Sequence, residues 1–187
     1  MRIFIALDIP EEIRARLREY IERVRSLSPD APWVRPESLH VTLKFIGEAT
    51  DARVAEVKNV LKQIKAQPFA VKFADVGFFP NHTSGRVFWA GVDGGEALPK
   101  LAGSIDQALQ KIGIEAEKRA YHPHLTLARA GTKSGAYQVF KQLPRGINQE
   151  EHPQFGTMTA QEFFLYKSEL SRGGAKYTKL ERFPLAQ

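Results

Sequence analysis

The chain has 187 residues, of which 43% are hydrophobic and 26% charged, and this length and balance are typical of one globular domain. It contains no cysteine, which excludes disulfides, thiol nucleophiles and zinc sites built on cysteine. No segment approaches the roughly 20 apolar residues that span a bilayer, and the N-terminal apolar run is too short for a signal peptide, so we expect a cytoplasmic protein. The net charge of +6 fits either plain solubility or attraction to a polyanion such as nucleic acid.

Apolar spacing predicts alternating strands and helices along the first half of the chain. Alternating or β-branched runs indicate strands, whereas apolar residues at intervals of three and four indicate helices. The expected elements are a strand over 2–8, a helix from Pro10, a short extended piece at 33–35, a strand over 40–47, a helix capped by Thr50, and a strand over 69–79 with a bulge or bend at Gly77.

The second half is predicted to continue in the same manner. The expected elements are a strand over 86–92, a helix from about Leu98 that Gly113 stops, an extended piece over 114–119, a strand from His124 to about Gly131, a short helix from the N-cap Ser134 to about Leu143, an interrupted strand over 155–170 and a last strand over 177–185.

Two of these strands share the pattern His, apolar, Thr, Leu, at residues 40–43 and 124–127. Side chains alternate between the faces of a strand, so each histidine and the threonine two residues later point the same way. Two such strands facing each other would give a cleft that contains two imidazoles and two hydroxyls.

The two patterns are separated by 124 − 40 = 84 residues, and the same offset recurs elsewhere. Among the pairs that it matches are Phe4 with Phe88, Ala6 with Ala90, Gly47 with Gly131, Thr50 with Ser134 and Phe79 with Phe163. We interpret this as an internal duplication within a single domain of residues 1–187. It predicts two pseudo-symmetric α+β lobes of antiparallel sheet with outer helices, over about 2–81 and 86–165, around a central cleft. Residues 166–187 would then add strands to one lobe.

Paired histidines at this offset favour acid–base chemistry at phosphorus. One imidazole can activate the attacking oxygen while the other protonates the leaving oxygen, so His40 and His124 are the catalytic candidates. Thr42 and Thr126 would donate hydrogen bonds to the non-bridging oxygens. The roles of two cationic side chains are left undecided. Lys44 shares a face with Thr42 by alternation and either contacts phosphate or is a solvated strand end. Arg129 reaches the site only if its strand bends.

Other chemistry has weaker support in the sequence. The pattern His122-Pro123-His124 resembles a metal-binding pair, with His40 as a third ligand, but no Asp or Glu lies in either motif and the offset places Ser38 opposite His122. His82, in a polar turn, either lies on the surface or lines a substrate groove. The paired-histidine scheme requires no metal, so none is predicted. The sequence has no glycine-rich nucleotide loop, so no cofactor is predicted either. Phe45 has the same alternation problem as Arg129 and is expected in the core.

With these residues in hand, the chain resembles the 2H phosphoesterase superfamily, and within it the RNA 2′,3′-cyclic phosphodiesterases, historically called 2′-5′ RNA ligases. The resemblance covers nearly the whole chain and rests on both His-x-Thr motifs and on five further segments: residues 2–8, 77–80, 87–92, 165–170 and 173–177.

The resemblance implies hydrolysis of a 2′,3′-cyclic phosphate at an RNA end to a 2′-phosphomonoester, without metal or nucleotide cofactor, and possible reversal as 2′-5′ ligation. It places His40 and His124 as the catalytic pair, Thr42 and Thr126 on the phosphate, and Arg129 beside it. By analogy His124 activates water and His40 protonates the leaving oxygen. The alternatives are a different cyclic nucleotide or 2′-5′ oligonucleotide as substrate, or a non-catalytic RNA-binding module. We expect a monomer with no membrane association.

Overall fold

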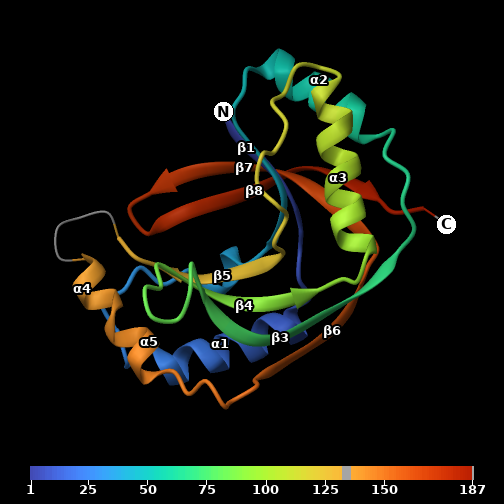
Figure 1. Ribbon diagram of the computed structural model, residues 1–187. Helices are drawn as coiled ribbons and strands as arrows, with labels where there is room; N and C mark the ends of the chain where they lie inside the picture. Colours follow the sequence, from blue (N-terminus) through green and yellow to red (C-terminus); the bar gives the residue numbers. More distant parts are fainter. Residues whose placement is uncertain (132–135, 187) are drawn as a thin grey trace.

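The computed structural model describes residues 1–131 and 136–186 (Figure 1). Its elements are, in chain order, β1 (Arg2–Leu7), α1 (Glu11–Arg25), the 3₁₀ helix η1 (Pro36–Ser38), β2 (Val41–Glu48), α2 (Asp51–Leu61), β3 (Phe69–Phe79), β4 (Val87–Asp93), α3 (Ala97–Gln110), β5 (His124–Arg129), α4 (Ala136–Phe140), α5 (Gln142–Gly146), β6 (Gln154–Ala160), β7 (Glu162–Ser171) and β8 (Gly174–Pro184).

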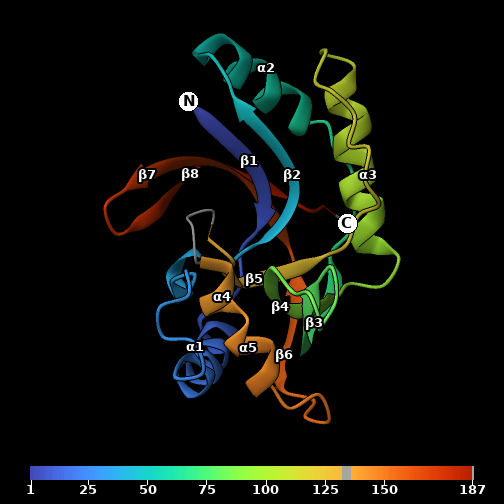
Figure 2. The ribbon, with the colours of Figure 1, turned by 60° about the vertical axis from the view of Figure 1, so that its left-hand side comes forward.

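The strands form two four-stranded antiparallel sheets. One has the order β2-β1-β7-β8 and the other β5-β4-β3-β6. Helices lie on the outside: α1 runs beneath the second sheet, whereas α2 and α3 lie together beside β2 (Figures 1 and 2). The expected α+β class, with antiparallel sheets and outer helices, is confirmed. Both His-x-Thr strands, β2 and β5, occupy the edge of their sheet.

The expected division into contiguous lobes over 2–81 and 86–165 is wrong. Strand β3 belongs to the first half of the chain but pairs with β4 and β6, and β7 pairs with β1. The helices are exchanged as well, because α1 contacts β6 and α3 contacts β2. Each sheet therefore draws on both halves of the chain, and the internal duplication stays a prediction about its origin. The segment from Glu162 adds β7 and β8 to the sheet of β1.

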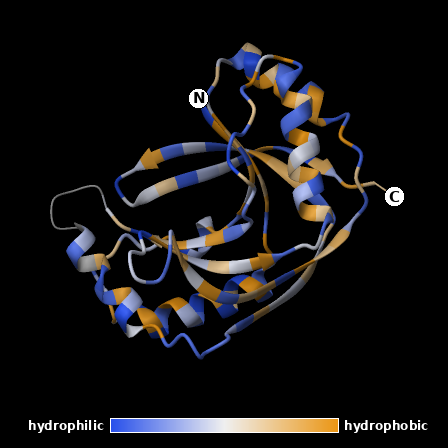
Figure 3. Ribbon diagram, in the orientation of Figure 1, coloured by the Kyte–Doolittle hydropathy of each residue, from blue (hydrophilic) through white to orange (hydrophobic). Residues whose placement is uncertain are grey.

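The helices form where the apolar spacing predicts them, because each buries one face. Helix α1 buries Ile13, Leu17, Tyr20, Ile21 and Val24. The Thr50 side chain caps α2 by accepting a hydrogen bond from the Arg53 amide at 3.2 Å. Figure 3 shows the matching alternation of hydrophobic and hydrophilic residues along α1 and α3. The predicted N-cap Ser134 lies outside the described residues. No helix among residues 1–131 and 136–186 combines the length and apolar character that would span a bilayer.

Strand β3 has its irregularity two residues earlier than expected. Pairing with β4 shifts between Phe73 and Val76, and Asp75 has φ = +66°, so the bulge is not at Gly77. Gly77 is instead needed for close packing, because a Cβ there would lie 2.2 Å from the Trp89 ring. Residues 114–119, predicted as extended, form no strand.

Candidate active site

The two His-x-Thr strands approach each other from the edges of their sheets. Strand β2 contacts β5, and the Tyr121 hydroxyl, just before β5, donates a hydrogen bond to the Thr42 carbonyl at 2.8 Å. Thr42 lies opposite Ala6, while Thr126 lies opposite Trp89. Ala6 and Phe4 belong to a small hydrophobic cluster, separate from the main core, whose Phe4 ring contacts His40. His40 and Thr42 therefore share one face of β2, as the alternation predicted.

Both imidazoles are oriented in the same way by the backbone. His40 Nδ1 lies 2.8 Å from the Ser38 carbonyl oxygen, and His124 Nδ1 lies 2.7 Å from the His122 carbonyl oxygen. A carbonyl only accepts, so each Nδ1 carries a proton and donates it. The lone pair of the neutral ring is then on Nε2, and neither Nε2 has a hydrogen-bond partner among the described residues. Each Nε2 can act as a base when the ring is neutral and as an acid when it is charged.

Aromatic rings surround both histidines. The His40 ring lies 4.7 Å from Phe4 and 5.1 Å from Tyr177, measured between ring centroids, and Tyr166 lies further out at 6.3 Å. On the other strand, the His124 and Phe79 rings are perpendicular, with centroids 5.1 Å apart and an interplanar angle of 89°. These rings exclude water from the sides of the imidazoles and hold them in place.

The environment lowers the pKa of both histidines, chiefly because burial disfavours the charged ring. The pKa of His40 is raised in part by the Ser38 carbonyl and the Asp8 carboxylate, and lowered further by Arg129 and His124. The pKa of His124 is lowered further by Arg129 and His122, with the carbonyl bond of His122 opposing this. A carboxylate therefore favours the charged form of His40 but not of His124.

A β-bulge follows each motif at the same position. In β2, Ala6 pairs with Thr42 and Ile5 with Lys44, which leaves Leu43 unpaired. In β5, Trp89 pairs with Thr126 and Phe88 with Ala128, which leaves Leu127 unpaired. One extra residue reverses the side on which the side chains that follow it point, up to the next irregularity, which in β2 is at Ile46. Alternation beyond each threonine is thus the opposite of that in a regular strand.

The bulge in β5 brings Arg129 to the site. Arg129 Nη2 donates a hydrogen bond to Thr126 Oγ1 at 3.4 Å, so the objection from strict alternation does not hold. Because the Thr126 oxygen accepts this bond, its own proton remains free to be donated to an anion.

The bulge in β2 makes two expectations wrong. Lys44 does not share the face of Thr42: its side chain is 5% exposed and its ammonium donates to Asp106 Oδ1 of α3 at 2.5 Å and to the Glu115 carbonyl at 2.9 Å. Phe45, expected in the core, is 49% exposed. Lys44 is therefore a structural residue that fastens α3 and the segment before β5 to β2, not a phosphate ligand.

The remaining histidines do not join the pair. His82 meets Phe78 edge-on at 5.2 Å and lines a cavity with Tyr137 and Lys141, which includes neither His40 nor His124. His122 supplies its carbonyl to His124. Within the described part of the chain, no three His, Cys, Asp or Glu side chains gather as metal ligands would.

Several neighbours of the site were not predicted from the sequence. Asp8 is one: it accepts hydrogen bonds from Arg14 at 2.9 Å and Lys179 at 2.6 Å, and its charge acts on His40. Tyr121 and Tyr177 are others. No local pattern marks them, because Asp8 lies in the short segment between β1 and α1 and the tyrosines reach the site only through the packing of segments distant in sequence.

The sequence profile of the LigT-like phosphoesterases matches residues 7–89 and 92–177. The chain belongs to this family of 2H phosphoesterases, and the resemblance found in the sequence is confirmed.

Its relatives include an RNA 2′,3′-cyclic phosphodiesterase of Archaeoglobus fulgidus, 32% identical over 98% of this chain and 99% of the relative. Another, of Methanothermobacter thermautotrophicus, is 33% identical over 99% of both chains. Among solved structures, E. coli LigT complexed with 3′-AMP superposes with a TM-score of 0.81 at 27% identity, covering 100% of this chain and 98% of the other.

Proposed function

We propose that the protein hydrolyses a 2′,3′-cyclic phosphate at the end of an RNA to a 2′-phosphomonoester, by acid–base catalysis from His40 and His124 and without a metal ion. The observation that carries the proposal is the matched orientation of the two imidazoles, each with Nδ1 on a backbone carbonyl and Nε2 without a hydrogen-bond partner in the described part of the chain. The relatives named RNA 2′,3′-cyclic phosphodiesterases match this chain over nearly its full length, which supports this choice of substrate. Both histidines come from one chain, so a monomer suffices.

In the proposed reaction, neutral His124 accepts the proton of the attacking water at Nε2. The new P–O bond forms as the bond to the ribose 3′ oxygen breaks, and charged His40 donates its Nε2 proton to that oxygen. Asp8 favours the charged form of His40 alone, which supports this assignment of roles. Thr42, Thr126 and Arg129 would hold the non-bridging oxygens, with Arg129 fixing the Thr126 hydroxyl.

The direct test is hydrolysis of an oligoribonucleotide that ends in a 2′,3′-cyclic phosphate, with and without excess EDTA, followed by separation of the 2′- and 3′-phosphate products. We expect equal rates in both conditions and only the 2′-phosphate. RNA that ends in a 5′-hydroxyl, added at high concentration, tests whether that hydroxyl replaces water and gives a 2′-5′ linkage. A rate abolished by EDTA and restored by a divalent cation would contradict the metal-independent mechanism, and RNA binding without turnover would favour a binding module.

The pH dependence follows from the lowered pKa values. Below both pKa values both imidazoles are charged and no base remains, and above both no acid remains, so kcat/KM should follow a bell. We expect its centre below about pH 6.5, the ordinary pKa of histidine, because burial lowers both values. Bound phosphate favours the charged rings, so the profile of kcat should be centred at higher pH. A kcat/KM profile centred above 6.5, or one that rises to a plateau, would contradict this assignment.

A further inference from the structure

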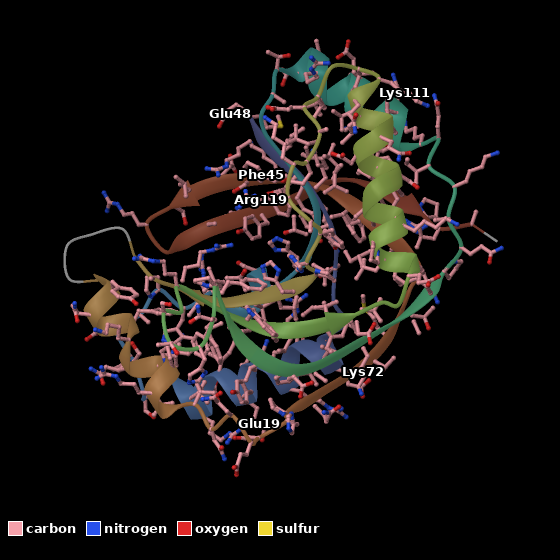
Figure 4. All side chains as sticks on the ribbon, viewed as in Figure 1. Glu19, Phe45, Glu48, Lys72, Lys111 and Arg119 are labelled. Carbon is pink, nitrogen blue, oxygen red and sulfur yellow. The ribbon has the colours of Figure 1, made fainter. Side chains whose placement is uncertain are left out.

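Phe45 is an exposed aromatic residue on the face of β2 that carries His40. It is 49% exposed, and the bulge at Leu43 turns it away from the core. Figure 4 shows Phe45 on the part of β2 that runs from the site toward α2. Its exposed ring is available to a ligand that extends along this face from the site.

An arginine lies over this ring. The Arg2 guanidinium carbon is 4.9 Å from the centre of the Phe45 ring. Glu48 pairs with Arg2 in the strand register, but its carboxylate binds the N-terminal ammonium at 3.1 Å. Arg2 takes part in none of the ion pairs found among the described residues. The pair therefore presents an aromatic ring and an uncompensated cation together.

Other aromatic residues lie on this face between Phe45 and His40. Phe45 lies opposite Phe4 in the register of β1 and β2. Phe4 in turn stacks on Tyr166, with ring centroids 5.1 Å apart and planes at 8°, and it contacts His40. Phe4 therefore lies between the proposed acid, which its ring contacts, and Phe45, its register partner.

We propose that Phe45 and Arg2 form a subsite for the nucleotide that precedes the cyclic-phosphate nucleotide in a single-stranded RNA, with its base stacked on Phe45 and its phosphate on Arg2. This inference rests on the proposed function. Bases of single-stranded RNA stack on aromatic rings and on guanidinium planes, and phosphates bind arginine. Four strand spacings separate Phe45 from His40 once the bulge is allowed for, or about 13 Å at ~3.3 Å each. That distance is too long for the terminal nucleotide and suits the next one.

The test compares two substrates: a nucleoside 2′,3′-cyclic monophosphate and a trinucleotide with the same cyclic end. In Phe45→Ala, we expect kcat/KM for the trinucleotide to fall about 5- to 150-fold, the range that corresponds to loss of one stacked base. The rate on the monophosphate should be unchanged. Phe45→Tyr, which keeps the ring, should retain the preference for the trinucleotide, whereas Phe45→Leu should lose it.

Arg2→Gln should raise KM for the trinucleotide but not for the monophosphate. It should also lower the slope of log KM against log salt by about 0.7, as for one lost contact to a single strand. Arg25→Gln, an exposed arginine in the last turn of α1 on the far side of the second sheet, makes the same charge change and should alter neither substrate. Equal losses on both substrates, or no loss on either, would overturn the subsite. If the unsubstituted enzyme hydrolyses neither substrate, the proposed function itself fails. If Phe45→Ala changes only self-association, the exposed ring is a contact between copies of the chain.

Discussion

Replacing either His40 or His124 with alanine is expected to lower kcat on a cyclic-phosphate RNA end by about 10² to 10⁴, the contribution of one positioned proton transfer. KM should change little, because the threonines and Arg129 would still hold the phosphate. The effects should not multiply in the double variant, since neither proton transfer is useful when the other is missing. Rates of the single and double variants, measured at the pH optimum of the unsubstituted enzyme, check this.

His152→Ala is the matched control for these variants. Its side chain is 73% exposed and pairs with Asp75, away from both strands of the site. It should retain full activity, and thermal unfolding should show that the His40 and His124 variants keep their fold. Undiminished hydrolysis by the His40, His124 double variant would refute the proposed mechanism.

Replacing Asp106 with alanine is expected to destabilise the fold by about 3–5 kcal/mol, the usual cost of leaving one member of a buried ion pair alone. The substitution leaves the Lys44 ammonium without its carboxylate in a buried position, because the Lys44 side chain is only 5% exposed, whereas that of Asp106 is 19% exposed. Lys44→Met should cost less, since Asp106 keeps its hydrogen bonds with the Glu117 amide and Gln110. Urea unfolding of the three proteins measures the difference.

A Lys44→Met, Asp106→Leu double variant provides the matched control. It removes both charges, so it should recover most of the stability lost in Asp106→Ala. Glu56→Gln, which breaks an exposed pair with Arg53, should change stability by less than about 1 kcal/mol. A stable Asp106→Ala protein would mean that Lys44 reaches water by a local rearrangement.

Much of the site could be predicted because it depends on short-range alternation. His40 and Thr42 share a face over only three residues, before any irregularity intervenes, and so do His124 and Thr126. The helices were predictable for a similar reason: the apolar spacing of α1 reports directly which side is buried.

The predictions that were wrong depend on the register between paired strands, which short sequence patterns do not specify. The unpaired Leu43 in β2 reversed the expected positions of Lys44 and Phe45, and the unpaired Leu127 in β5 did the same for Arg129. Register also explains a misleading match at the 84-residue offset: Phe4 lies on the face of His40, whereas Phe88 is fully buried in the main core. The pairing partners of Thr42 and Thr126, Ala6 and Trp89, differ by 89 − 6 = 83 residues, so β4 is displaced by one residue relative to β1.

The use of backbone carbonyls to hold both imidazoles separates two properties that a carboxylate partner would join. A carboxylate that orients a histidine also raises its proton affinity, so geometry and basicity change together. Here a neutral peptide oxygen fixes each ring, and more distant charges such as Asp8 and Arg129 bias the proton. The working pH of such an enzyme can therefore shift through substitutions around the site while the direction of both reactive nitrogens stays the same.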